Sequence, residues 1–354
     1  MRVDDQSSAH RAPDRSSTPA TGHATAVAHP NIALVKYWGK RDERLVVPRT
    51  DSLSMTLDVF PTTTRVHLAA AAGPDTVMLD GAPAAGEARR RVVAFLELVR
   101  KRAGSARAAV VTSENTVPTG AGLASSASGF AALAVAAATA YGLDLDATAL
   151  SRLARRGSGS ASRSLFAGFA QWHAGPRAAS DAEADLGSYA EQVPVGALDP
   201  ALVIAVVNAG PKAVSSRAAM RRTVETSPLY EPWTRSSADD LVDMRAALVR
   251  GDLEAVGEIA ERNALGMHAT MLAARPAVRY LAPATLSVLD AVLHLRQDGV
   301  AAYATMDAGP NVKVLCRRAD AERVADAVRN AAPDAAVHTA GPGPAARLLD
   351  GGGR

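Results

Sequence analysis

A segment rich in glycine and serine, residues 115–129, carries the strongest chemical signal in the sequence. Gly120 and Gly122 let its backbone turn tightly and approach a ligand. Ser125 and Ser126 place hydroxyl groups at the expected start of a long apolar helix, where free N–H groups and the helix dipole attract anions. The spacing matches neither the common P-loop nor the dinucleotide fingerprint. The segment predicts a phosphate-binding loop, or else a turn that only caps a helix.

Two lysines lie close together in a chain that otherwise uses arginine. Only five of the 39 basic residues are lysines, and Lys36 and Lys40 stand in the segment KYWGK. A lysine is a compact cation that suits a phosphate or a tunable proton. In an extended chain both lysines would share a face with Trp38, and Tyr37 would face the other way. A turn at Gly39 would break that alternation, and the alternative is a strand end with solvated lysines.

Asp307 follows an apolar segment and precedes Gly309 and Pro310. A turn there can hold the carboxylate rigidly at the end of a strand. Such a group can orient a hydroxyl or accept its proton, as the aspartate of a kinase does. The alternative is an aspartate that only caps the turn.

Arg163 closes a second turn of small residues, GSGSASRS at 157–164. Its planar guanidinium fits a carboxylate, and Ser158 and Ser160 leave room for a ligand. The alternative is a Gly-Ser linker followed by a surface arginine.

A further candidate anion site opens a predicted helix at Ser215, Ser216 and Arg217. Serine is a good N-cap, and the helix start together with the arginine attracts anions. Plain capping with a solvated arginine is the alternative. His268 lies on a predicted helix beside two methionines and is interpreted as a core or surface residue rather than a catalyst.

These residues need a framework of alternating elements. Periodicity and the positions of glycine and proline predict strands from Ala24 and at 54–60, 64–70, 108–112, 201–209 and 300–306. They predict helices at 86–103, from the glycine-serine loop to Gly142, at 146–156, 215–226, 236–250, 252–272 and 283–298, and a strand–helix–strand unit that ends near 338. We expect a disordered extension over 1–24, lobes at 25–198 and 199–345, and a mobile tail at 346–354.

Composition narrows the class of protein. The 354 residues are 48% hydrophobic and 21% charged, which is typical of a globular chain and excludes a disordered or fibrous one. The net charge of +3 is too small for a nucleic-acid-binding surface. A single cysteine excludes an internal disulfide and favours a cytoplasmic location. No apolar segment is long enough to suggest a bilayer helix.

Five motifs carry a family resemblance. The loop from Pro118 to Gly129 resembles the phosphate loop of the galactokinase, homoserine kinase, mevalonate kinase and phosphomevalonate kinase superfamily. Segments 31–40, 157–172, 214–228 and 306–315 resemble mevalonate diphosphate decarboxylases, one branch of that superfamily, in collinear order. The resemblance implies a two-lobed α+β fold with the active site in a cleft between the lobes. It also implies a homodimer that uses ATP and Mg²⁺ to convert mevalonate 5-diphosphate into isopentenyl diphosphate, ADP, phosphate and CO2.

The resemblance assigns roles to individual residues. It makes Asp307, Lys36 and Arg163 catalytic, and it gives substrate contacts to Tyr37, Lys40, Ser158, Gly159, Ser160, Ser216 and Arg217. It gives the ATP phosphates to Pro118, Gly120, Gly122, Leu123, Ala124, Ser125 and Ser126, and a Mg²⁺ contact to Ser125.

One segment departs from the family pattern, because Thr50 and Asp51 replace an amide and a hydroxyl. A carboxylate there would repel phosphates unless it is paired, and Arg49 is the candidate partner. Three alternatives stay open: a decarboxylase of mevalonate 5-phosphate, a kinase that does not decarboxylate, and a catalytically silent ATP- or isoprenoid-binding relative.

Overall fold

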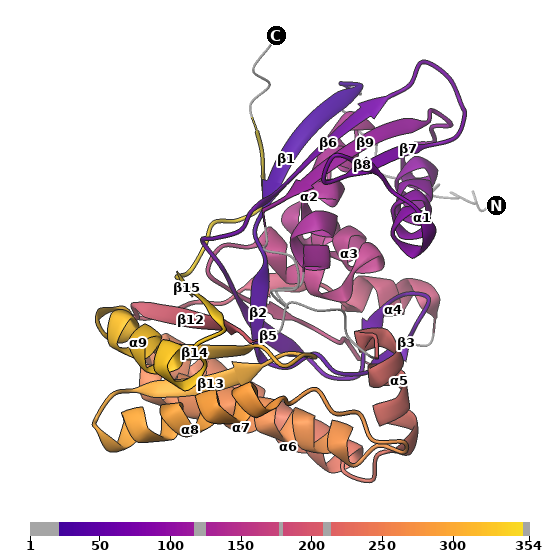
Figure 1. Ribbon diagram of the computed structural model, residues 1–354. Helices are drawn as coiled ribbons and strands as arrows, with labels where there is room; N and C mark the ends of the chain where they lie inside the picture. Colours follow the sequence, from indigo (N-terminus) through magenta and orange to yellow (C-terminus); the bar gives the residue numbers. More distant parts are fainter. Residues whose placement is uncertain (1–20, 117–124, 177–179, 208–213, 350–354) are drawn as a thin grey trace, which may run out of the picture.

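The computed structural model describes residues 21–116, 125–176, 180–207 and 214–349. These residues form three larger sheets and a short two-stranded ribbon, β3 (Lys40–Asp42) with β4 (Val47–Pro48). Figure 1 shows one sheet with its helices in the upper part of the view and a second sheet with long helices in the lower part. This arrangement agrees with the two-lobed α+β fold expected from the sequence.

The first sheet has strand order β16-β1-β6-β9-β7-β8. Its strands are β1 (His23–Ala28), β6 (Thr62–Leu68), β7 (Thr76–Leu79), β8 (Ala82–Pro83), β9 (Ala109–Asn115) and β16 (Arg347–Leu348). α2 (Ser125–Ala140) packs on β1 and β6, with α1 (Gly86–Ala103) and α3 (Ala147–Gly157) beside it. The predicted helix at 86–103 is confirmed with the same bounds.

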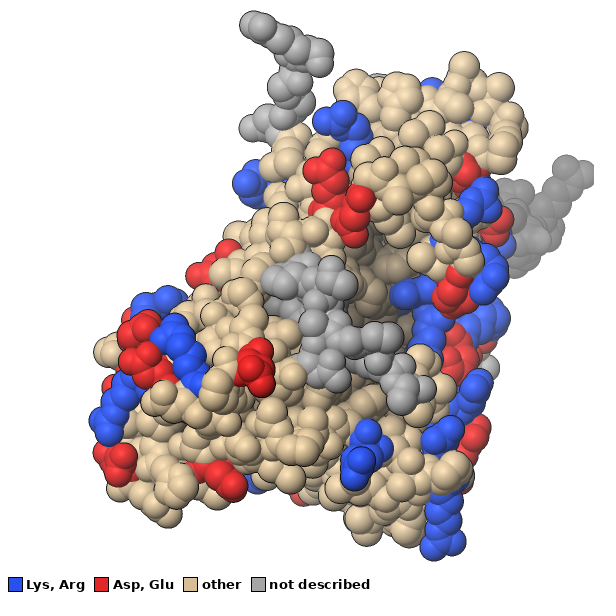
Figure 2. Space-filling view, viewed as in Figure 1, with Lys and Arg blue, Asp and Glu red and all other residues tan. Residues whose placement is uncertain are grey.

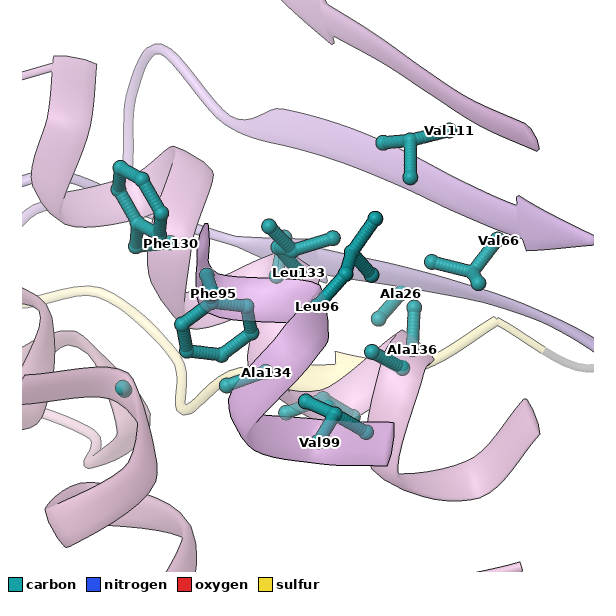
Figure 3. Close-up of a cluster of buried hydrophobic side chains, with 14 of the residues drawn as sticks. Ala26, Val66, Phe95, Leu96, Val99, Val111, Phe130, Leu133, Ala134 and Ala136 are labelled. Carbon is teal, nitrogen blue, oxygen red and sulfur yellow. The ribbon is translucent and has the colours of Figure 1, made fainter. Parts of the chain in front are cut away.

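α2 is buried on nearly all sides because half of its residues are alanine. Small side chains let its axis approach both the sheet and the neighbouring helices. Figure 3 shows Phe95, Leu96 and Val99 from α1 packed with Phe130, Leu133, Ala134 and Ala136 from α2, under Ala26, Val66 and Val111 of the strands. The helix that begins at Ser125 is therefore a rigid support for whatever lies at its N-terminus.

The middle sheet has strand order β11-β10-β5-β2. Its strands are β2 (Asn31–Val35), β5 (Ser52–Thr56), β10 (Phe169–Trp172) and β11 (Ala190–Gln192), and α4 (Asp181–Gly187) precedes β11. Side chains from β2 and β5, such as Ile32 and Met55, share one core with Ile204 of the next sheet and Met244 of its helices. One core therefore joins the middle sheet to the last sheet and its helices.

The last sheet has strand order β13-β14-β12-β15. Its strands are β12 (Pro200–Val206), β13 (Ala302–Met306), β14 (Val312–Arg317) and β15 (Ala336–Ala340). α8 (Pro283–Gln297) and α9 (Ala321–Ala331) pack on one face. α6 (Tyr230–Arg250), α7 (Leu253–Leu272) and the middle sheet pack on the other, while α5 (Ser216–Thr226) precedes them.

Two predicted boundaries are wrong. The segment after β15 returns to the first sheet, where Gly343 N–H donates to the Thr56 carbonyl at 2.7 Å and β16 pairs with β1. The expected mobile tail is therefore ordered over 346–349, because its backbone pairs with an exposed strand edge. At the other end, β1 begins at His23, one residue before the predicted start. None of the helices in the described residues is long and apolar enough to span a membrane.

Candidate active site

Asp307 lies immediately after β13, with its carboxylate between two lysines. Lys36 Nζ is 3.0 Å from Oδ1 and Lys313 Nζ is 3.4 Å from Oδ2. Both lysine side chains are 1% exposed, whereas that of Asp307 is 30% exposed, so the carboxylate remains accessible. Burial alone would raise the pKa of Asp307, but the two ammonium groups hold it well below its usual range. The carboxylate is ionised and can accept a hydrogen bond from a ligand.

The backbone of Asp307 is fixed as well. Its carbonyl accepts hydrogen bonds from Gly309 N–H at 2.7 Å and from His268 Nε2 at 3.2 Å. Burial, together with the charge of Lys36, lowers the pKa of His268 to about 4. A neutral imidazole can donate this bond. His268 is 3% exposed, so it is a core residue that supports the turn.

Lys36 follows the last residue of β2 and points into the protein. Its backbone N–H donates to Asn263 Oδ1 at 2.8 Å, and its Nζ also donates to the Ala33 carbonyl at 2.7 Å. Burial lowers the pKa of Lys36, and the charges of Lys313 and Arg163 lower it further, while Asp307 opposes them. Lys36 and Asp307, 271 positions apart in the sequence, therefore form one buried ion pair.

Lys313 is a residue that sequence reasoning missed. It lies in β14, opposite Thr305 of β13 and Ile204 of β12. The sequence contained a sign of its importance, because Lys313 is one of only five lysines and interrupts an apolar strand. In a strand that alternates faces, it shares a face with Leu315, which packs in the core that includes β2. That face leads directly to Lys36.

Arg163 is held inside the 3-10 helix Gly159–Leu165 by neutral groups. Its Nη1 donates to Ser52 Oγ at 2.6 Å, its Nε to Ser54 Oγ at 2.9 Å and its Nη2 to Asn31 Oδ1 at 3.4 Å. The residue is 2% exposed, and burial lowers its pKa to about 10. No carboxylate forms an ion pair with it among the residues that the structure describes. A buried cation with only neutral partners is suited to an anionic ligand.

Aromatic rings lie beside Arg163. Its guanidinium is 5.8 Å from the centre of the Trp172 ring, and Tyr37 packs edge-on against Trp172 at 4.7 Å between ring centres. Gly159 makes this packing possible, because a Cβ there would lie 2.7 Å from Trp172 Cη2 and 3.1 Å from Tyr37 Cε1. Burial raises the pKa of Tyr37, and the charges of Arg163 and Arg217 act against burial by lowering it. Tyr37 thus lies within electrostatic range of both arginines.

The KYWGK segment is not extended. β2 ends at Val35, and Gly39 has φ +107°, so a turn at Gly39 breaks the alternation that an extended chain would have. Lys36 and Trp38 are both buried, while Lys40 pairs with Glu43. A side chain at Gly39 would collide with the hydroxyl of Tyr230, which donates to the Trp38 carbonyl at 2.7 Å.

Ser215 caps α5, since its Oγ accepts from Ala218 N–H at 3.3 Å. Ser216 is the first residue of the helix and is partly buried. Arg217 is exposed, and its Nη1 lies 3.0 Å from Oε1 of Glu87 in α1. This ion pair joins α5 of the last lobe to α1 of the first lobe, and both helices lie on the right-hand side of the view in Figure 1.

Much of the predicted phosphate loop, including Pro118, Gly120, Gly122, Leu123 and Ala124, lies outside the described residues. Its described end places Ser125 at the exposed start of α2. Ser126 Oγ is 3.2 Å from Ser158 Oγ, which is 3.4 Å from Ser160 Oγ. The end of the phosphate loop and the small-residue turn are therefore neighbours. Figure 2 shows the surface hollowed between the upper and lower parts of the molecule, with Lys and Arg side chains along the right-hand side of the view.

The expected partner of Asp51 is wrong. Its Oδ1 accepts from Ala174 N–H at 2.8 Å, and its Oδ2 accepts from Gln171 Nε2 at 2.8 Å and lies 3.3 Å from Nδ1 of His173. Arg49 instead lies near Glu231. Asp51 points toward β10, where hydrogen bonds from Gln171, His173 and Ala174 lower its pKa and stabilise its charge.

Comparison with known proteins places this geometry in a family. Residues 28–184 match the model of the diphosphomevalonate decarboxylase-like N-terminal domain, and residues 202–342 match that of the mevalonate 5-diphosphate decarboxylase C-terminal domain. Diphosphomevalonate decarboxylase of Gibberella zeae is 36% identical over 86% of this chain and 83% of its own length. The Homo sapiens protein of the same name is 37% identical over 82% of this chain and 76% of its own.

Solved structures agree. A structure of MDDEF in complex with MVAPP, AMPPCP and magnesium is 43% identical, with TM-score 0.86 over 92% of this chain and 98% of that one. Mevalonate diphosphate decarboxylase from Staphylococcus aureus is 37% identical, with TM-score 0.86 over 93% and 98%. Both domain matches, the relatives and the fold agree: the chain belongs to the diphosphomevalonate decarboxylase family.

Proposed function

We propose that this protein converts mevalonate 5-diphosphate into isopentenyl diphosphate, with ATP consumed and ADP, phosphate and CO2 released. Arg163 carries the proposal. Among the described residues, its buried guanidinium donates hydrogen bonds to neutral serine and asparagine side chains, and it lies in electrostatic range of Asp307, which is held between two lysines. A substrate that bears both a carboxylate and a hydroxyl can place the carboxylate against Arg163 and the hydroxyl against Asp307.

In the first step, Asp307 aligns the tertiary hydroxyl with the γ-phosphate of ATP. The oxygen–phosphorus bond forms, the bond to ADP breaks, and the hydroxyl proton leaves by way of the carboxylate. Because two ammonium groups stabilise the ionised form of Asp307, its main contribution is orientation rather than strong basicity. Lys36, 3.0 Å from the same carboxylate, stabilises negative charge on the reacting oxygen.

In the second step, the carbon–oxygen bond to the new phosphate breaks. The carbon–carbon bond to the carboxylate then supplies its electron pair to the double bond, and CO2 leaves. Arg163 holds the carboxylate beside the reacting carbon until this happens. Lys36 faces the departing phosphate.

The substrate contacts are assigned to Tyr37, Lys40, Ser158, Gly159, Ser160, Ser216 and Arg217, of which Tyr37, Lys40, Ser216 and Arg217 take the diphosphate. Lys40 and Arg217 each pair with an exposed glutamate, Glu43 and Glu87 respectively. A carboxylate at the surface is held weakly, so a diphosphate can replace these glutamates. Two such cations favour the diphosphate over the monophosphate.

The phosphates of ATP are assigned to the loop that ends at Ser125 and Ser126. The exposed Ser125 hydroxyl is an oxygen donor of the type that Mg²⁺ prefers. Among the described residues, no group of three or more His, Cys, Asp or Glu side chains is arranged to hold a metal ion. When bound, Mg²⁺ neutralises phosphate charge and orients the transferred group.

A homodimer and a cytoplasmic location belong to the same proposal. Exposed apolar side chains recur at seven-residue intervals, two helical turns apart, on three helices: Val242 and Val249, Leu265 and Leu272, Leu286 and Leu293. Exposed apolar side chains of this kind support an interface with a second copy. Sedimentation velocity tests it, with two chains per particle expected and a monomer at micromolar concentration contradicting it.

Product analysis tests the catalytic proposal. The protein is incubated with ATP, Mg²⁺ and, separately, mevalonate, its 5-phosphate and its 5-diphosphate. We expect equal ADP and CO2 with the diphosphate alone. The same products from the monophosphate would transfer the assignment to the alternative substrate, and ADP without CO2 would make the protein a kinase.

A further inference from the structure

Two buried lysines share one carboxylate beside the proposed reaction centre. Lys36 and Lys313 approach different oxygens of Asp307, at 3.0 and 3.4 Å, and both side chains are 1% exposed. One carboxylate can neutralise only one of these ammonium groups. Arg163 adds a third positive charge within range of Lys36. The centre therefore carries more positive than negative charge before any substrate binds.

Lys313 is rigidly placed for this arrangement. It lies within β14, which is bonded on both sides by β12 and β13. Its Nζ reaches Asp307 and, at 3.5 Å, the carbonyl of Asn311. A lysine inside a sheet costs desolvation energy, since burial disfavours its charge. Its position opposite Oδ2 leaves Oδ1 to face Lys36.

We propose that Lys313 is a positioning residue of the active site, which fixes the orientation of the Asp307 carboxylate that it shares with Lys36. Lys313 itself does not touch the substrate in this account. It acts through the carboxylate that both lysines contact. The positive charge of Lys313 offsets part of the stabilisation that Asp307 gives to the charged form of Lys36. The effect of Lys313 on Lys36 can be measured in the protein without substrate, whereas the effect of Lys313 on turnover rests on the proposed function.

The groups that face Lys36 all bear on its titration. Asp307 favours the charged form, while Lys313 and Arg163 oppose it. His268 also lies at this centre, and its pKa of about 4 leaves it neutral across the useful pH range. Without the positive charge of Lys313, the Asp307 carboxylate stabilises the charged form of Lys36 with no second ammonium group in contact with it among the described residues. The pKa of Lys36 then rises, by about 1 to 3 units for the loss of a nearby like charge.

The test uses the small number of lysines. Five lysines, labelled with ¹³C at Cε, give five signals to follow by NMR from pH 7 to 11. Lys36→Arg and Lys313→Arg assign the two relevant signals. The variants for the titration are Lys313→Met, which removes the charge, and Lys313→Arg, which keeps it. Lys101→Met is the matched control, because Lys101 is exposed on α1, away from the proposed catalytic groups.

In Lys313→Met we expect the Lys36 signal to titrate about 1 to 3 pH units higher than in the parent protein. Lys313→Arg and Lys101→Met should leave it in place. For activity, Lys313→Met should lower kcat about 100-fold through misplacement of Asp307, with the KM of both substrates within about twofold. The arginine variant should recover part of kcat.

An unchanged Lys36 titration in Lys313→Met would overturn the proposal, and so would full kcat in that variant. If Lys313→Met does not fold, Lys313→Gln takes the same measurements, since its amide can still donate to Asp307 without a charge. If the parent protein releases no CO2 from mevalonate 5-diphosphate, the proposed function fails. The NMR titration still decides whether the lysines are coupled.

Discussion

Replacing Arg163 with methionine separates binding from stability at the proposed carboxylate site. Methionine fills a similar volume without a charge, and the side chain is 2% exposed in the parent protein. Burial lowers the Arg163 pKa to about 10, and this fall corresponds to a burial cost of about 3 kcal/mol. The substitution removes that cost. It also removes hydrogen bonds to three neutral side chains, at about 1 kcal/mol each.

These two changes nearly cancel. We therefore expect the free energy of unfolding of Arg163→Met to lie within about 2 kcal/mol of the parent value. Activity should respond quite differently, because loss of a buried charge pair with the substrate carboxylate costs about 2 to 5 kcal/mol. That corresponds to a fall in kcat/KM of about 30-fold to 4,000-fold.

The assays are urea unfolding and steady-state release of CO2. Arg155→Met is the matched control, since Arg155 is equally buried but pairs with Asp185 in α4. It should leave kcat/KM unchanged, since Asp185 keeps Arg102 and Arg156 as partners. If Arg163→Met is destabilised by clearly more than about 2 kcal/mol, or keeps kcat/KM within threefold, Arg163 is a structural residue and its proposed role is refuted.

Three further substitutions test other parts of the account. Gly159→Ala should cost about 1 to 3 kcal/mol of stability and reduce turnover, since its Cβ would press on Trp172 at 2.7 Å, whereas Gly129→Ala meets nothing within 4 Å and should do neither. Arg217→Gln should raise the KM for the phosphosubstrate about tenfold and leave the KM for ATP unchanged; equal losses for both would count against the assignment. His173→Gln tests a pH effect, because hydrogen bonds to two carboxylates raise the pKa of His173. The parent protein should exceed the variant in stability most below about pH 6.5, and the excess should fall as pH rises through the folded pKa. Urea titrations at several pH values would show this, and a constant difference would disprove it.

Local patterns predicted most elements well. The helix at 86–103 matches α1 because glycine and proline precede it and Gly104 ends it in the left-handed conformation. α6 begins at Tyr230 rather than at 236, since Pro232 lies in its first turn, where no backbone N–H is needed. The small-residue turn at 157–164 forms a 3-10 helix instead, which its composition did not indicate.

The site was predicted as far as its motifs reached. The resemblance placed Lys36 beside Asp307, and the two side chains are in contact. Asn31 was missed as a partner of Arg163, because the two residues lie 132 positions apart and meet only in the folded chain. Lys313 was missed although Asp307 lies only six positions before it, because the turn between β13 and β14 brings the two side chains together. The partner of Asp51 was predicted wrongly because contacts with residues distant in the sequence determine it. Its partners lie on β10, 120 residues away, while the adjacent arginine points elsewhere.

The most direct measurement of the central claim is the ratio of CO2 to ADP formed from mevalonate 5-diphosphate in a single turnover, with enzyme in excess over substrate. The account predicts one CO2 for each ADP, and neither product from Asp307→Asn on the same time scale. ADP formed without CO2 would show that phosphorylation is not followed by elimination. That result would contradict the roles given to Lys36 and Arg163.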